Sequence, residues 1–298
     1  METPWKTIAM PALLAVSLLG CHAHSKTQVI PVVALPAPVD SFRWPHGAKA
    51  AVTLTYDDAL DSQFAFVAPD LQQRGLHGTF FVLGENIDGE NMAEWREVSA
   101  EGNELASHTI THPCQDAEAA RFTASQMNRE LDDSVVLLKQ LTGKPGPFNF
   151  AYPCGERMFG PPGRPIDYSA LVSRRFPAAR VAGGIIMDPL HDPLDAVPGI
   201  TPDLPFEDHD GSSLIERVRQ AEQRGGWIVF IFHAVGERDG YRPTSREAHA
   251  QLIDYLAQNR EAVWTGTFAE VSSYITAKRR NGGSLPMQKV AEREGPPR

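Results

Sequence analysis

Two short clusters of carboxylate and imidazole side chains supply the residue types from which proteins build metal and acid–base sites. Asp57 and Asp58 are adjacent and follow an apolar, β-branched run, while His108 and His112 are four residues apart. On one helical turn that spacing aims two imidazoles at a single point, and such pairs suit zinc or a similar divalent ion. Each cluster alone also has a structural explanation, because Asp commonly caps helices and a histidine pair can lie on the surface without a ligand.

Taken together, the clusters provide two histidines and one aspartate, a set that leaves open metal positions for water and substrate. The second aspartate is then free to act as a base. A further candidate is His233, which follows the apolar run 227–232 and, in a parallel α/β fold, projects at the catalytic face. A lone histidine at a strand end is common, so the assignment of His233 depends on the two clusters.

Strands and helices alternate along most of the chain. Apolar runs typical of strands occur at residues 50–56, 79–82, 104–106, 148–152, 180–182, 227–232 and 263–265. Helical patterns occur up to residue 71 and over 91–100, 127–141, 168–175, 213–223, 246–259 and 268–278. This order predicts a parallel sheet, and the absence of a G-x-G-x-x-G or P-loop opening leaves both a barrel and a doubly wound sheet possible. We expect an α/β fold with a single distorted (β/α) barrel of about seven strands, and a long irregular loop over residues 184–211.

Composition excludes several classes of partner and architecture. The 298 residues include 28 Lys and Arg against 37 Asp and Glu, a formal charge of −9, which argues against nucleic acid as the main partner. With 42% hydrophobic and 22% charged residues, the chain has the composition of an ordinary globular protein. Collagen, coiled-coil and polytopic membrane architectures are excluded.

The N-terminal residues are typical of a targeting segment. Lys6 precedes a mostly apolar run over 7–19 that is too short to span a bilayer, so residues 1–20 are predicted to be a signal peptide. Residues 18–21, Leu-Leu-Gly-Cys, resemble the bacterial lipobox, which predicts lipidation of Cys21. The alternative is an ordinary secretory signal with a chance cysteine. We expect an exported protein of the cell envelope, lipid-anchored to a membrane at its periplasmic or surface face.

The rest of the chain is predicted to form one domain with flexible flanks. Residues 21–41 contain prolines without helical periodicity and are expected to be a tether. The domain is expected over residues 42–278 and a disordered tail over 279–298. Cys114 and Cys154 are candidates for a disulfide, because an exported chain folds where disulfides are stable.

Three motifs occur in an order and at intervals typical of one known family. Residues 55–58 are Thr-Tyr-Asp-Asp, residues 108–113 are His-Thr-Ile-Thr-His-Pro, and residues 231–233 are Ile-Phe-His. Over residues 44–276 the chain therefore resembles the polysaccharide deacetylases, carbohydrate esterase family 4, which share the NodB-homology domain.

The resemblance implies a role for each residue of the clusters. It implies that Asp58, His108 and His112 hold a divalent metal, expected to be zinc with cobalt as an alternative. A metal supplies a nucleophile at neutral pH by lowering the pKa of bound water. The resemblance further implies that Asp57 is the general base and that His233 is the general acid for the leaving group. An acetylated polysaccharide or oligosaccharide is the implied substrate.

One segment departs from the commonest form of the family's third motif, Arg-x-Pro-Tyr-Gly. Residues 150–155 are Phe-Ala-Tyr-Pro-Cys-Gly, so Ala151 replaces the arginine that orients the catalytic aspartate. Cys154 replaces the tyrosine, whose contribution to the oxyanion hole is a backbone N–H that Cys154 can still donate. Arg180 is the best candidate to supply the missing cation. The partner of His233 is expected among three aspartates of the long loop, Asp188, Asp192 and Asp195.

These residues are compatible with two main functions. The favoured one is a metal-dependent hydrolase that removes N-acetyl or O-acetyl groups from a glycan. Its rival is a carbohydrate-binding lipoprotein of the same fold with weak or no turnover, which the loss of the motif arginine favours. The retained Asp57, Asp58, His108, His112 and His233 favour the enzyme. A metal phosphoesterase would need more ligands for two metals than the sequence offers.

Overall fold

The computed structural model describes residues 42–114, 122–161 and 163–281. The predicted signal peptide 1–20, the tether 21–41 with Cys21, and residues 282–298 of the predicted tail lie outside the described residues.

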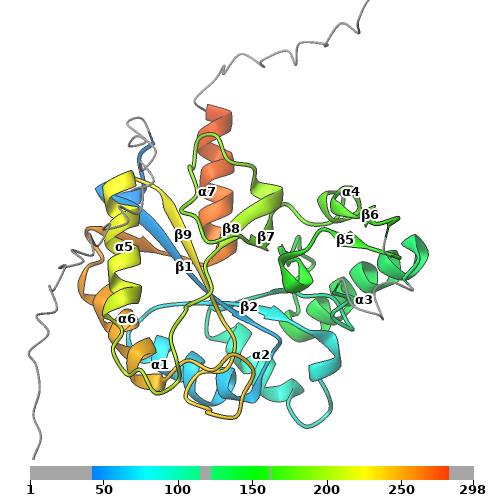
Figure 1. Ribbon diagram of the computed structural model, residues 1–298, viewed down its shortest axis with the longest axis horizontal. Helices are drawn as coiled ribbons and strands as arrows, with labels where there is room; N and C mark the ends of the chain where they lie inside the picture. Colours follow the sequence, from blue (N-terminus) through cyan, green and yellow to red (C-terminus); the bar gives the residue numbers. More distant parts are fainter. Residues whose placement is uncertain (1–41, 115–121, 162, 282–298) are drawn as a thin grey trace, which may run out of the picture. The chain divides into compact units, whose positions relative to one another are not determined.

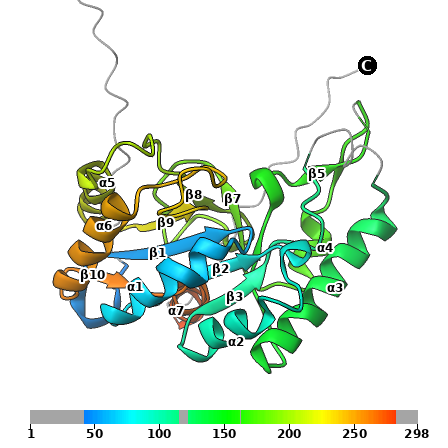
Figure 2. The ribbon, with the colours of Figure 1, turned by 90° about the horizontal axis from the view of Figure 1, so that it is seen from below.

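Eight parallel strands form one sheet that almost closes into a barrel, as Figures 1 and 2 show. The strand order is β10-β1-β2-β3-β4-β7-β8, and β9 pairs with β1. Ile200, just after β8, bridges to Phe230 of β9, so seven strands run around a ring while β10 pairs only with residues 50–52 of β1. The prediction of a distorted (β/α) barrel is confirmed. The strands are β1 (Ala50–Asp57), β2 (Thr79–Val82), β3 (Glu104–Ser107), β4 (Phe150–Ala151), β7 (Ala179–Ala182), β8 (Val197–Gly199), β9 (Trp227–Phe232) and β10 (Val263–Thr265).

Helices surround the ring, and a short antiparallel pair, β5 (Met158–Phe159) and β6 (Ile166–Asp167), lies near α4 (Figure 1). The helices are α1 (Ala68–Gln73), α2 (Met92–Ala100), α3 (Ala124–Thr142), α4 (Ser169–Ser173), α5 (Ser212–Arg224), α6 (Arg246–Gln258) and α7 (Phe268–Asn281). Among the described residues, no helix combines the length and apolar character needed to cross a membrane.

Two details differ from the sequence-based expectation. α7 continues to Asn281, so residues 279–281 are helical and not part of a disordered tail. The stretch 184–211, expected to be irregular, contains β8, a three-residue Val-Pro-Gly strand. Neither a proline nor a glycine favours a strand, and β8 forms because its neighbour β7 offers a free edge.

Alternation along β1 decides which side chains reach the barrel interior. Val52, Leu54 and Tyr56 belong to the large hydrophobic cluster under the surrounding helices, whereas Ala51 belongs to a second cluster inside the ring. Because successive side chains of a strand point to opposite faces, Asp57 shares the inner face with Ala51.

α7 packs where the strands begin. The Phe268 ring lies 5.1 Å from that of Trp227, the first residue of β9, and the Phe268 N–H donates to Oγ1 of Thr79, the first residue of β2. The opposite end of the barrel, where the strands finish, carries the charged side chains described next.

Candidate active site

The predicted catalytic residues meet at the carboxyl ends of the strands. Asp57 ends β1, His108 follows β3, Arg180 lies in β7 and His233 follows β9. In a parallel barrel these positions converge on one face. They line a cavity of about 250 Å³, together with His112, Tyr152, Cys154, Gly155, Ala182, Thr201, Ile231, Tyr241 and Arg242.

Asp57 and Arg180 form a buried ion pair inside the ring. Arg180 Nη2 donates to Asp57 Oδ2 at 2.5 Å, and the two residues are 2% and 3% exposed. Burial acts to raise the pKa of Asp57, but Arg180, with His108 and His233, outweighs it and holds that pKa below its ordinary value. Gly199 leaves room for Ile231 and Arg180, since a Cβ there would lie 2.6 Å from Ile231 Cδ1 and 3.1 Å from Arg180 Cδ. The Arg180 guanidinium thus contacts the aspartate that it was predicted to orient. Its catalytic role stays a prediction.

The pair yields a stability prediction. Arg180→Met should lower the free energy of unfolding at pH 7 by about 3–5 kcal/mol, because Asp57 would stay buried without its counter-charge. Urea unfolding followed by circular dichroism measures the change. Adding Asp57→Asn should recover most of the loss, since no buried charge then remains. Equal stability of Arg180→Met and the parent would contradict this account of the pair.

Asp58, His108 and His112 form a donor set for a divalent metal. One potential ligand atom from each lies within 4.8 Å of the others. Asp58 Oδ1 is 3.6 Å from His108 Nε2 and 3.8 Å from His112 Nε2, and it is buried without a hydrogen-bond partner in the described structure. Burial and the neighbouring Asp57 raise the pKa of Asp58 to about 7. An orphaned carboxylate oxygen facing two imidazole nitrogens fits a cation.

The state of His108 also suits a metal ligand. Its Nδ1 lies 2.9 Å from the carbonyl oxygen of Ala151, so a proton on Nδ1 leaves the Nε2 lone pair facing Asp58. Burial lowers the pKa of His108 to about 3, so the imidazole is neutral near pH 7.

The prediction that His108 and His112 share one helical turn is wrong. Residues 108–114 form a loop in which Thr109 and His112 have left-handed backbone, with φ of 67° and 55°. Glu130 of α3 shapes this loop, because its carboxylate accepts the N–H groups of Ile110 and Thr111, each at 2.8 Å. Sequence reasoning missed Glu130, although a glutamate between Met127 and Leu131 on the apolar stripe of α3 was the available signal.

His233 faces both carboxylates. Its Nε2 is 4.0 Å from Asp57 Oδ2 and 4.0 Å from Asp58 Oδ2, and burial lowers its pKa to about 4. The predicted aspartate partner is wrong, since Nδ1 has no hydrogen-bond partner among the described residues. Asp188 instead contacts His191, and Asp192 accepts the N–H of Asp188, so both aspartates stabilise their own loop.

Comparison with known proteins agrees with this geometry. Residues 45–158 match the family model of polysaccharide deacetylase. This match places residues 45–158 within the polysaccharide deacetylase family. The chain is 25% identical over 257 residues to a gellan lyase of Bacillus sp., covering 78% of this chain and 10% of that protein. It is also 30% identical over 97 residues to a peptidoglycan-N-acetylglucosamine deacetylase of Bacillus cereus, covering 32% of this chain and 33% of that protein.

The chain therefore spans a third or less of the length of these two relatives. A solved structure, a putative polysaccharide deacetylase from Mycobacterium smegmatis, shares the fold with a TM-score of 0.57 and 16% identity. The match covers 87% of this chain and 98% of that one.

A disulfide joins the two loops that flank the cavity. Cys114, which follows the metal-ligand loop, is bonded to Cys154 in the altered third motif, 40 residues away in sequence. Cys114 Sγ also lies 3.4 Å from His112 Nδ1. His112, Cys114 and Cys154 group as a second set of potential metal ligands, but the disulfide occupies both sulfurs. The backbone role of Cys154 in an oxyanion hole stays a prediction.

Removal of this disulfide should destabilise the domain. The chain-entropy model gives about 4 kcal/mol for a closed loop of 40 residues, so a Cys114→Ser/Cys154→Ser variant should unfold at clearly lower urea. The parent in excess dithiothreitol is the matched control and should behave like the variant. Identical unfolding midpoints of variant and oxidised parent would show that the bond contributes nothing.

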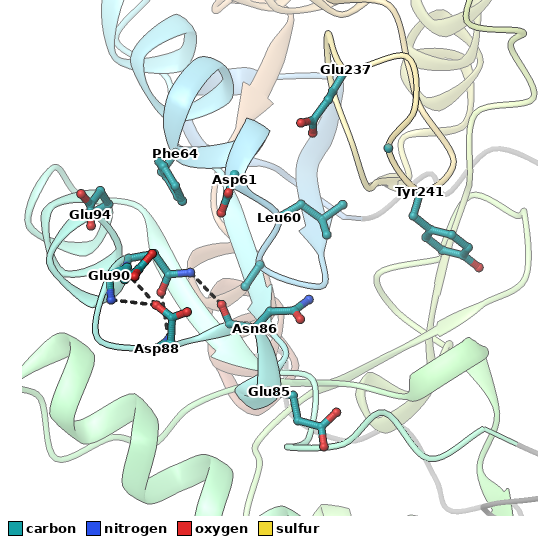
Figure 3. A pocket seen from close by; sticks show the side chains of 13 residues that line it. Leu60, Asp61, Phe64, Glu85, Asn86, Asp88, Glu90, Glu94, Glu237 and Tyr241 are labelled. Carbon is teal, nitrogen blue, oxygen red and sulfur yellow. Dashed lines mark hydrogen bonds between the residues drawn. The ribbon is translucent and has the colours of Figure 1, made fainter.

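An acidic pocket adjoins the catalytic cavity, and Tyr241 borders both. Its volume is about 550 Å³, and Figure 3 shows carboxylates from several segments around it. This pocket was not predicted from the sequence, because its acids come from three separate stretches of the chain. They are Asp61, Glu85, Asp88, Glu90, Glu94 and Glu237.

Proposed function

We propose that this chain is a metal-dependent hydrolase that removes acetyl groups from an acetylated glycan, cleaving an N-acetyl amide or an O-acetyl ester. The observation that carries the proposal is the Asp57–Arg180 ion pair beside the donor set of Asp58, His108 and His112, two of which line the same cavity as the pair. A divalent metal held there, zinc or else cobalt, would lower the pKa of a water molecule and polarise the acetyl carbonyl.

Asp57 is suited to accept a proton. Arg180 occupies its Oδ2 and keeps the carboxylate ionised, while Oδ1 has no hydrogen-bond partner among the described residues. We assign Asp57 as the group that takes the proton from the attacking water, with Oδ1 as the oxygen that Arg180 leaves free to accept it. The fixed guanidinium holds the base in one orientation throughout.

His233 is suited to return a proton to the leaving amine or alkoxide. It is neutral in the free protein, because burial holds its pKa near 4, so it must gain a proton during the cycle before it can act as an acid. Its Nε2 faces the two carboxylates, which places the donating atom beside the base. The backbone N–H of Cys154 is our candidate to stabilise the oxyanion.

Acetate release from a panel of glycans tests the proposal. The panel contains chitin oligosaccharides, peptidoglycan, acetylated exopolysaccharide and acetylxylan, each incubated with the zinc-loaded chain. We expect acetate from at least one of them. Binding to a glycan without acetate release would favour the rival function, a carbohydrate-binding protein with weak or no turnover. The absence of the family's arginine at position 151 would be consistent with that function.

We also propose that the chain is exported and anchored in the cell envelope through a lipid on Cys21. The lipobox-like residues 18–21 support this. Cys21→Ser should abolish acylation and release the protein from membranes, as fractionation and intact mass would report. A variant that still carries acyl mass and still sediments with membranes would exclude the anchor.

A further inference from the structure

The turn that carries the two aspartates has an unfavourable backbone. Strand alternation would point Asp58 away from the face that Asp57 occupies. Instead Asp58 and Ala59 both adopt left-handed backbone, with φ of 77° and 55°, and the chain turns so that both carboxylates face His108 Nε2, at 3.8 and 3.6 Å. Two successive non-glycine residues rarely adopt this conformation unless their surroundings enforce it.

Gln63 holds the first carbonyl of this turn. It is fully buried, and its Nε2 donates to the carbonyl oxygen of Asp57 at 2.5 Å and to that of His233 at 3.2 Å. It begins η2 (Gln63–Val67), a π-helical segment of a kind frequent at functional sites. The Oγ of the adjacent Ser62 accepts a hydrogen bond from the N–H of Val235. This segment therefore links the residues that follow β1 to the residues that follow β9.

Asn86 holds the second carbonyl. It lies in η3 (Gly84–Asn86), after β2, and its Nδ2 donates to the carbonyl oxygen of Asp58 at 2.7 Å. Its own carbonyl oxygen accepts a hydrogen bond from Asn91 Nδ2 at 2.8 Å, which fixes the segment at the edge of the acidic pocket (Figure 3). Both carbonyls of the aspartate pair are thus held by side-chain amides from different segments.

We propose that Gln63 and Asn86, here called the amide clamp, are positioning residues that keep the Asp57–Ala59 turn in its left-handed form. Their observed contacts are with backbone carbonyls, so they act through Asp57, Asp58 and His233. The effect on turnover rests on the proposed function, whereas the effect on the backbone and on metal affinity does not.

The clamp predicts a different defect for each residue. Gln63→Met removes the amide that donates to the backbone carbonyls of Asp57, the proposed base, and His233, the proposed acid. We therefore expect kcat to fall about 10–100-fold while KM stays within about threefold. Asn86→Leu frees the carbonyl of the ligand residue Asp58, so the affinity of the metal-stripped protein for cobalt, followed by visible absorption, should fall about tenfold or more. Asn86 is exposed, so its variant keeps the fold even if Gln63→Met does not.

Asn103→Leu is the matched control. Asn103 is also a buried amide, accepting from the N–H of Gly78 and donating to the carbonyl of Val98, but it lies outside the cavity. It should lower thermal stability and leave kcat and cobalt affinity unchanged. Ala59→Gly is the rescue variant, because glycine adopts positive φ without a steric penalty. Added to Gln63→Met, it should restore at least a third of the lost turnover.

The outcomes separate the clamp from the function. If the parent releases no acetate from any glycan, the proposed function fails. The clamp is then tested separately by cobalt titration and by hydrogen exchange of the backbone amides of residues 58–60. Exchange should accelerate at least tenfold in either clamp variant. Unchanged exchange and cobalt affinity in both variants, or equal defects in Asn103→Leu, would overturn the clamp.

Discussion

Replacing Asp57 with asparagine is expected to reduce kcat for acetate release by about 10²–10⁴-fold while metal binding persists. The amide keeps the shape of the side chain but cannot accept the proton at the oxygen that Arg180 leaves free. The measurement is the rate of acetate release beside the metal content of the same sample.

Asp58→Asn is the matched comparison, because it changes the adjacent residue in the same way. It should weaken cobalt affinity, since a charged ligand is lost, and its activity should recover partly at high metal concentration. If Asp57→Asn loses its metal while Asp58→Asn retains it, the two aspartates have the opposite roles.

His108→Ala is expected to abolish measurable turnover, and removal of the metal with a chelator should do the same to the parent. His108 is the most buried of the three candidate ligands, and the Ala151 carbonyl fixes its tautomer, so its loss removes the most rigidly held donor of the set. Zinc or cobalt added back should restore the chelated parent but not the variant.

His77→Ala is the control for general effects of histidine loss. His77 is exposed and lies against Gly102, outside the residues that line the cavity, so this variant should match the parent. Full activity of His108→Ala with no bound metal would contradict the proposal that the reaction depends on a metal.

Residues inside regular strands were predictable from the sequence. Apolar runs located β1, β7 and β9, and the convergence of parallel strands then brought Asp57, Arg180 and His233 to one end of the barrel. These positions depend on local patterns and on a simple topological rule.

The features that were predicted wrongly or missed depend on contacts between segments that are distant in the sequence. Glu130 shapes the loop that contains His108 and His112, and the four-residue spacing of the two histidines does not predict that contact. Gln63 reaches His233 across 170 residues of sequence, and its single amide leaves no periodic pattern. A barrel predicts where strands end, but not which side chains from other segments hold the turns that follow.

The central claim is that Asp57, beside a metal held by its neighbours, drives deacetylation. The most direct test compares acetate release by the parent and by Asp57→Asn, both with equal measured zinc content, on the glycan that the parent deacetylates fastest. The account predicts rapid release by the parent and a rate at least about 10²-fold lower for the variant. Equal rates, or no acetate from the zinc-loaded parent on any glycan, would contradict it.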